Sequence, residues 1–343
     1  MRAMSHAFFT PACTSNLRKK GMVMSMKESQ TNAKGRMASL RLSLQQSDRL
    51  RRRGKRIAGR LLLYFLLIGI SVVFVYPILY MLVNSFKTVN DLVNPGIEWI
   101  PTSLYIGNYR RAIVAMDYWR SLAFTVIFTA AATLFQTISC ALAGYSLARH
   151  RFPLKNLWMA LIVVAFLIPS QVTLIPRYLQ FFKYGLVNTP WSILLPAAFG
   201  QGVNSTIFIL VFHQFFASYP RSFDEAAQLD GASRLRVFFR VALPICSPAI
   251  IVSLLFSFVW FWNETYNAGM LMGSSQSLLP IKLSSFMELF NNAYASAADG
   301  VSRLNESQNM AATILVIAPL LLIYLVLQKR FIEGIESTGL TGE

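Results

Sequence analysis

One polar segment, residues 222–244, holds the residue types whose spacing could do chemistry, and that chemistry is helix capping and close packing. Ser222 and Glu225 stand three positions apart, which is the spacing of a helix capping box. Asp224 and Glu225 also place negative charge at the positive end of the helix dipole. Two alanines follow them. We therefore expect a short helix whose small side chains allow another helix to approach closely.

A second helix is predicted after Gly231, because glycine suits the left-handed turn that ends the first helix. Ser233 can cap this second helix, in which apolar positions alternate with arginines. Pro244 then precedes a long apolar run. The segment is expected to form a helix–turn–helix at the membrane surface. On physical grounds alone, an amphipathic hairpin that lies in the interface without a partner is an equal alternative.

The anchors of this segment, Glu225-Ala226-Ala227, Gly231, Val241 and Leu243-Pro244, keep fixed spacings. In this arrangement the segment resembles the EAA loop of binding-protein-dependent ABC import permeases, the MetI-like inner-membrane components. The family has Ile where Val241 stands. The resemblance implies docking on a separate ATPase subunit. The residues it assigns to ATPase coupling are Glu225, Ala226, Ala227, Asp230, Gly231, Leu243 and Pro244.

The resemblance extends over about Tyr109–Glu343 and favours the carbohydrate branch, as the second permease of a maltose-type pair. The strings that carry it are Asn108-Tyr109-Arg110, Ala143–Arg149, Ile168-Pro169, Ile175–Tyr178, Gly185–Thr189, Trp262-Asn263-Glu264 and Gln328–Phe331 with Gly334. It implies import of a sugar or oligosaccharide. The implied partners are a second homologous permease, two ATPase subunits and an extracytoplasmic solute-binding protein. An import permease for a non-sugar solute is the alternative.

The composition indicates that a membrane surrounds these motifs. Hydrophobic residues make up 55% of the 343 residues and charged residues only 14%, whereas soluble domains carry about 25% charged residues. A membrane-spanning helix needs about 20 mostly apolar residues. The windows that meet or approach this length without Asp, Glu, Lys or Arg are Leu61–Phe86, Ser121–Ala148, Asn156–Pro176, Asn188–Phe212, Val241–Asn263 and Met310–Leu327.

Only helices satisfy the backbone of such long apolar runs in lipid. The expected fold is therefore all-α, a polytopic membrane bundle of six transmembrane helices with the coupling helix–turn–helix between spans 4 and 5. Residues 1–57 are expected to form a basic, disordered cytoplasmic tail. Residues 58–115 would hold the first transmembrane helix and an outer loop, and residues 116–330 the permease domain. Residues 331–343 would form a cytoplasmic C-terminal tail.

Basic residues set the expected orientation. The first 57 residues hold fourteen Lys and Arg against two acidic residues. Further basic residues lie between spans 2 and 3, between spans 4 and 5 and after span 6. The positive-inside rule places these loops and both termini in the cytoplasm, which for the resembled family is the inner side of a bacterial cell membrane. We expect the basic tail to lie against membrane lipid rather than to bind nucleic acid.

Candidate residues for the solute path gather near the outer end of the fifth span. They are Trp260, Trp262, Asn263, Glu264 and Tyr266, together with Asn204 in the fourth span. Sugars present apolar C–H faces and hydroxyl rims, which aromatic faces and amide or carboxylate groups match. Aromatic residues also collect at membrane interfaces for purely structural reasons. Asn204 and Gln136 could equally bond a neighbouring helix.

The sequence contains no motif that would make the chain an enzyme. There is no G-x-x-x-x-G-K-[ST] phosphate loop, no nucleophile elbow and no HExxH. His, Cys, Asp and Glu show no metal-ligand spacing. We expect a transport subunit without cofactor or metal, with ATP and Mg bound by the partner ATPase. Charge-free spans disfavour an ion-coupled secondary transporter, and the missing carboxylate cluster disfavours a membrane glycosyltransferase.

Overall fold

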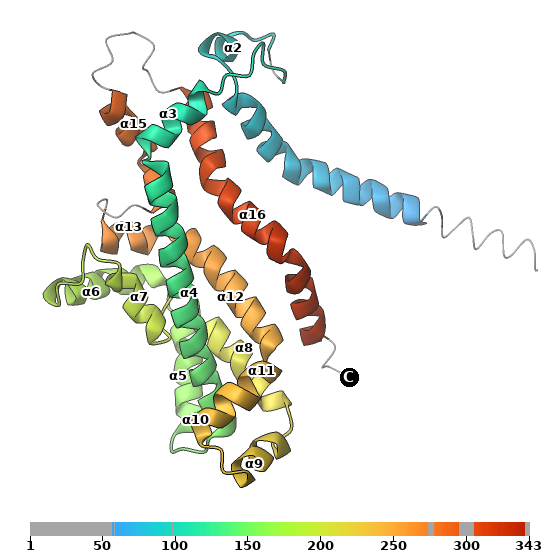
Figure 1. Ribbon diagram of the computed structural model, residues 1–343, viewed down its shortest axis with the longest axis vertical. Coiled ribbons are helices and arrows are strands. Elements are labelled where there is room, and N and C mark those ends of the chain that lie inside the picture. The colour runs from blue at the N-terminus through green and yellow to red at the C-terminus, as the bar shows by residue number, and fades with distance from the viewer. Residues whose placement is uncertain (1–56, 58, 98, 274–277, 295–304, 340–343) are drawn as a thin grey trace, which may run out of the picture. The chain divides into compact units, whose positions relative to one another are not determined.

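A computed structural model describes residues 57, 59–97, 99–273, 278–294 and 305–339, and every regular element in them is helical (Figure 1). The chain forms two compact units, Met1–Pro77 and Ile78–Glu343. Apart from Ile57, the predicted basic tail lies outside the described residues. The predicted boundaries of the membrane and tail segments stay predictions.

Three of the predicted windows are confirmed as continuous helices that are long and apolar enough to cross a membrane. These are Gly59–Ser85, α4 (Tyr118–Arg149) and Glu306–Val326, the first part of α16 (Glu306–Gly339). α4 contains no proline over its 32 residues, so its hydrogen-bond ladder is uninterrupted. α16 continues through residues 331–339, the start of the predicted C-terminal tail.

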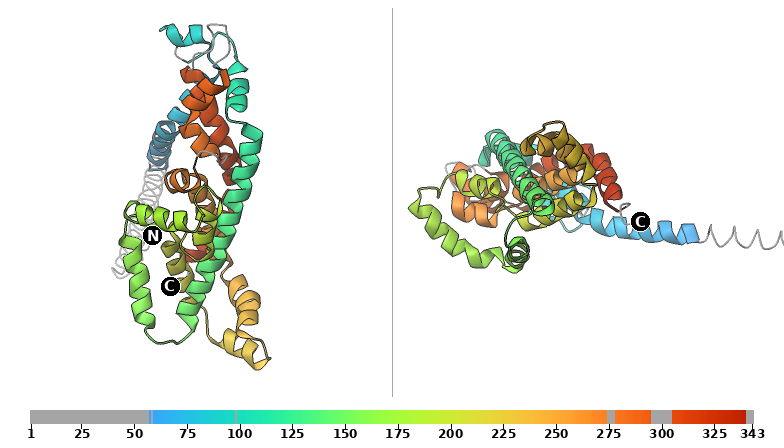
Figure 2. Two further views of the ribbon diagram at one scale, coloured as in Figure 1. Left: turned by 90° about the vertical axis from the view of Figure 1, so that its left-hand side faces the viewer. Right: turned by 90° about the horizontal axis from the view of Figure 1, so that it is seen from below.

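The third window, Asn156–Pro176, was wrongly expected to be one straight span. α5 (Lys155–Leu167) and α6 (Ser170–Lys183) meet at an angle of 101° (Figure 2). Ile168, between them, has an extended backbone with φ −82° and ψ 117°. The ring of Pro169 clashes with a helical conformation at the residue before it. This proline therefore breaks the span rather than kinking it.

The fourth window, Asn188–Phe212, is interrupted as well. α7 (Trp191–Ala198) and α8 (Ser205–Ser218) flank residues 199–204, which are not helical. Asn204 has φ 53°, a left-handed conformation that a right-handed helix cannot contain. Neither helix reaches the roughly 20 residues that a crossing needs.

The fifth window, Val241–Asn263, contains a sharp bend of 82° at Cys246, ahead of α12 (Ser247–Trp262). Before the bend lie three short helices, α10 (Arg234–Val237), the π-helical turn η1 (Phe238–Ala242) and α11 (Leu243–Ile245). Pro248 lies in the first turn of α12 and has no N–H to continue the helix across the bend. Counting each bent pair as one span gives up to five spans. A sixth would need the interrupted α7–α8 stretch, so six spans stay a prediction.

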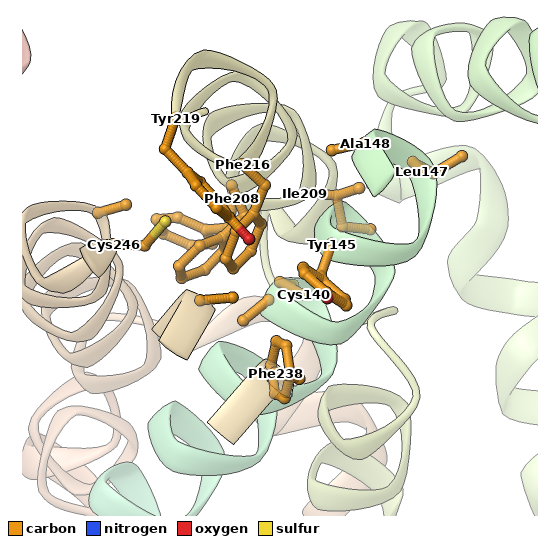
Figure 3. Packing of buried hydrophobic residues seen from close by; sticks show 14 residues of the cluster. Cys140, Tyr145, Leu147, Ala148, Phe208, Ile209, Phe216, Tyr219, Phe238 and Cys246 are labelled. Carbon is orange, nitrogen blue, oxygen red and sulfur yellow. The ribbon is translucent and has the colours of Figure 1, made fainter. Parts of the chain in front are cut away.

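Within Ile78–Glu343, α4 is the central element and packs against α8, α12 and α7 (Figures 1 and 2). Its inner end lies in an aromatic cluster, in which Tyr145 contacts Phe216 and Phe238 at ring-centroid distances of 5.2 and 5.1 Å (Figure 3). Gly144 brings α4 and α8 together, since a Cβ at this position would stand 2.6 Å from the Cβ of Phe212. The helices that complete this unit are α2 (Val89–Val93), α3 (Gly107–Ala115), α9 (Ser222–Leu229), α13 (Tyr266–Met272), α14 (Leu279–Ser284) and α15 (Phe286–Tyr294).

Buried polar groups fix the outer segment around α2. Thr88 and Asp91 form a reciprocal capping box, with each side chain accepting from the other backbone N–H at 3.2 Å. The Thr102 hydroxyl donates to Asp91 at 2.6 Å, and this hydrogen bond lowers the pKa of the Asp91 carboxyl. Asn108 donates to the carbonyls of Ser85 and of the residue before Thr88, both at 2.9 Å. The outer segment is therefore an ordered structure in its described part.

Candidate functional site

The predicted helix–turn–helix is formed by α9 and α10. Gly231 ends α9 with φ 79°, and the N–H of Ala232 bonds to the carbonyl of Ala227 at 3.0 Å, as in a Schellman motif. Ser233 caps α10 by accepting the N–H of Arg236 at 3.4 Å. The predicted roles of Gly231 and Ser233 in the hairpin are confirmed.

The predicted capping box at Ser222 and Glu225 is wrong by one residue. Arg221 is the N-cap of α9, and it makes no side-chain cap bond. It follows Pro220 and already has helical angles, φ −67° and ψ −23°. Because the helix begins one position earlier than expected, Ser222 lies inside the first turn. Its hydroxyl is therefore not at the position from which a cap acts.

Most residues predicted to contact an ATPase lie on the surface of the described chain. The exposed ones are Glu225, Ala226, Asp230, Gly231 and Pro244, while Ala227 and Leu243 are half-buried. Large apolar side chains beside them are also exposed, namely Phe223, Leu229, Leu235 and Phe239. An apolar patch with an acidic edge is typical of a protein-binding surface.

An ion pair at the base of this hairpin escaped the sequence-based interpretation. Arg149, the last residue of α4, lies 3.5 Å from Asp224 of α9, measured from Nε to Oδ2, and both side chains are buried. The sequence suggested only a flanking charge at Arg149 and a helix-dipole role for Asp224. Their separation along the chain gives no signal of the contact. Removing either partner would leave a buried charge unpaired, which costs about 3–5 kcal/mol.

Gln136 of α4 holds the interrupted α7–α8 stretch in place. Its Nε2 donates to the carbonyl of Val203 at 2.9 Å and to the hydroxyl of Ser257 in α12 at 3.0 Å. The hydroxyl of Ser205 donates to its Oε1 at 3.0 Å. Non-helical backbone at membrane depth needs such partners. The expected bonding of Gln136 to neighbouring helices is confirmed.

Gly202→Ala should disturb this arrangement. A Cβ at Gly202 would stand 2.1 Å from Oε1 of Gln136 and 3.0 Å from the ring of Phe261. The Gln136 amide would have to leave its partners, and we expect a loss of about 1–2 kcal/mol of unfolding free energy. Thermal unfolding of the detergent-purified protein measures this loss. Gly269→Ala is the matched control, because nothing lies within 4 Å of its added Cβ. Equal melting temperatures for the two variants would contradict the contact.

A pocket of about 560 Å³ opens beside the interrupted stretch, between α5, α6, α7, α8 and the end of α12. Polar side chains that line it are Arg177, Gln201, Asn204, Thr206, Glu264 and Asn267. Asn204 and Glu264, two of the predicted solute-path residues, are thus brought together. Arg177 and Glu264 are the pocket's charged residues and have opposite signs. Phe261 adds an aromatic face.

The other predicted path residues lie away from this pocket in the described structure. Trp260 packs against two phenylalanines, with ring-centroid distances of 5.1 and 5.7 Å. Trp262 is buried among apolar side chains of the outer cluster. Asn263 donates to a carbonyl of its own helix at 2.9 Å, and Tyr266 is exposed. Contact of these four residues with a solute stays a prediction.

Comparisons with known proteins agree with this geometry. Residues 140–337 match the family described as "Binding-protein-dependent transport system inner membrane component". The chain is 30% identical over 278 residues to the diacetylchitobiose uptake system permease protein NgcG of Streptomyces coelicolor, covering 80% of this chain and 86% of that protein. It is 24% identical to the arabinooligosaccharides transport system permease protein AraQ of Halalkalibacterium halodurans, covering 84% and 100%.

A likeness in fold connects the chain to a crystal structure of a bacterial ABC transporter involved in the import of the acidic polysaccharide alginate. The TM-score is 0.67, and the match covers 81% of this chain and 98% of that one. Sequence identity over it is 23%. The bent and interrupted helices therefore belong to a known arrangement of membrane helices.

Proposed function

This chain belongs to the family of binding-protein-dependent transport system inner membrane components, and from that premise we propose that it forms the membrane path of an importer for a sugar or oligosaccharide. Relatives named as permeases for diacetylchitobiose and arabinooligosaccharides support the sugar class. The chain itself would not hydrolyse ATP. A separate ATPase would bind ATP and Mg and supply the free energy.

The pocket beside residues 199–204 is the observation that carries the sugar class. A neutral sugar needs many hydrogen-bond partners and an apolar face for its C–H groups. Amides and hydroxyls line this pocket together with Phe261, and the charges of Arg177 and Glu264 balance. A site for an amino acid or an oxyanion would instead need an excess of one charge. Asn204 and Glu264 are the proposed solute contacts.

The hairpin α9–α10 is the proposed ATPase-docking surface, with Glu225, Ala226 and Ala227 at its centre. Asp230 and Gly231 end the docking helix α9, and Leu243 with Pro244 leads back to α12. A second related permease, two ATPase subunits and an extracytoplasmic solute-binding protein complete the proposed transporter. Both termini and the hairpin would face the cytoplasm. ATP must bind one of the two transport states more tightly to shift their populations.

Purification of the intact complex from its bacterial membrane tests this proposal. A soluble ATPase should accompany the chain, and mass spectrometry of the bound solute should identify a sugar. Uptake into proteoliposomes should need ATP and the solute-binding protein. Uptake driven by an ion gradient without ATP would favour a secondary transporter, and a bound non-sugar solute would favour the alternative substrate class. Labelling of a cysteine at Ala227 from outside the cell would contradict the topology.

A further inference from the structure

Asp224 is held by two residues from other elements. Besides its ion pair with Arg149, its Oδ1 accepts a hydrogen bond from the hydroxyl of Tyr219, which directly follows α8. The guanidinium of Arg149 lies 3.6 Å from the centroid of the Tyr219 ring and donates to the Tyr219 carbonyl. Burial, together with the bond to Asp224, raises the pKa of Tyr219, so the hydroxyl remains a donor. Each of the three residues contacts the other two.

The docking helix α9 has little other attachment to the membrane helices. Asp224 is its one buried residue, and its neighbours Glu225 and Ala226 are exposed. The remaining contacts of α9 within the described chain are chiefly with α10 and η1, which belong to the same hairpin and its continuation. The side-chain link between α9 and the bundle is therefore concentrated in one carboxylate.

The other end of this link is the longest uninterrupted span in the centre of the bundle. Arg149 is the last residue of α4, and Gln136 of the same helix holds the interrupted stretch that lines the pocket. The two residues are separated by about 20 Å at 1.5 Å per residue. A helix without proline transmits a displacement of one end to the other as a nearly rigid rod. Movement of Arg149 therefore reaches the pocket.

We infer that Arg149, Tyr219 and Asp224 form a latch that transmits movement of α9 into α4 and so makes ATP hydrolysis drive solute passage. This inference rests on the proposed docking of an ATPase at α9. The three side chains are positioning residues, because they face neither the pocket nor the exposed surface of the docking helix. Arg149 suits this place since its planar guanidinium can stack on the Tyr219 ring while it pairs with a carboxylate.

Uptake and ATP hydrolysis measured together in proteoliposomes test the latch, with the complete complex. Asp224→Asn should lower the solute imported per ATP hydrolysed by about tenfold, while the ATPase still co-purifies in wild-type amount. Tyr219→Phe removes only one hydroxyl and should have a smaller effect in the same direction. Arg149→Lys should retain more uptake per ATP than Arg149→Gln, because it keeps the charge. Arg151→Gln is the control, an exposed cation in the adjacent loop.

Unchanged uptake per ATP in both Asp224→Asn and Arg149→Gln would overturn the latch. A loss of uptake that merely follows a loss of co-purified ATPase would overturn it too, since the residues would then serve docking or folding. Tyr219→Phe keeps the inference testable if the charge variants do not fold. A wild-type complex that lacks an ATPase would instead contradict the proposed function, so the two failures are distinguishable.

Discussion

Glu225→Lys combined with Gly231→Trp should release the ATPase from this chain and abolish ATP-driven uptake. Glu225 is exposed in the first turn of α9, and Gly231 ends that helix with φ 79°. Lysine would reverse the charge at the centre of the proposed contact. Tryptophan would strain the left-handed turn and cover the groove-facing end of α9. We expect co-purified ATPase to fall about 100-fold, which is roughly 2.8 kcal/mol of binding free energy.

The chain offers a closely matched control for this experiment. Glu288 is an exposed carboxylate of α15, and Gly185 has φ 67° with nothing within 4 Å of an added Cβ, as is also true of Gly231. Glu288→Lys combined with Gly185→Trp therefore repeats the same changes of charge and backbone strain away from the hairpin. This control should keep its ATPase. Retention of ATPase and transport by the Glu225 and Gly231 double variant would show that the docking assignment is wrong.

Gly144→Ala should destabilise the folded bundle more than any other single methyl group considered above. Its Cβ would stand 2.6 Å from the Cβ of Phe212, 2.9 Å from the backbone N of His213 and 3.0 Å from the carbonyl of Ile209. Two of these atoms are backbone, so α4 and α8 would have to separate. The cost is about 3 kcal/mol, at the upper end for an overpacked interior. The expected result is a lower melting temperature and less folded protein in the membrane.

Gly69→Ala is the control for this substitution, because Gly69 also lies in a long helix and nothing lies within 4 Å of its added Cβ. Alanine has the higher helix propensity, so this variant should be at least as stable as the wild type. Fluorescence-detected gel filtration after heating compares the two. A Gly144→Ala variant as stable as Gly69→Ala would mean that α4 and α8 do not approach closely.

Local spacing predicted the hairpin well because its signals are local. The left-handed turn at Gly231 and the cap at Ser233 depend on neighbours within a few residues, and both were expected. The breaks at Pro169 and Asn204 were not, since hydropathy over a window reports composition and not direction. The ion pair of Arg149 and Asp224 joins elements that are far apart in the chain, and no pattern in one element reveals the other.

The solute-path prediction was partly limited by helix geometry. Consecutive residues of a helix point in directions about 100° apart. Trp260 and Trp262 therefore face different neighbours on α12, one toward α8 and the other toward the outer cluster. A run of adjacent candidates cannot all line one pocket. Asn204 and Glu264 line it because they lie at the ends of helices, where the chain changes direction.

The two bends at Pro169 and Cys246 determine where this protein can deform. Each proline next to a bend lacks an N–H, so one backbone hydrogen bond is missing there, and a change of angle has fewer bonds to break. α4 and α8, by contrast, are interlocked at Gly144. The compliance of the bundle is therefore concentrated in two joints, on α5–α6 and on α11–α12, that swing about a stiff two-helix mast.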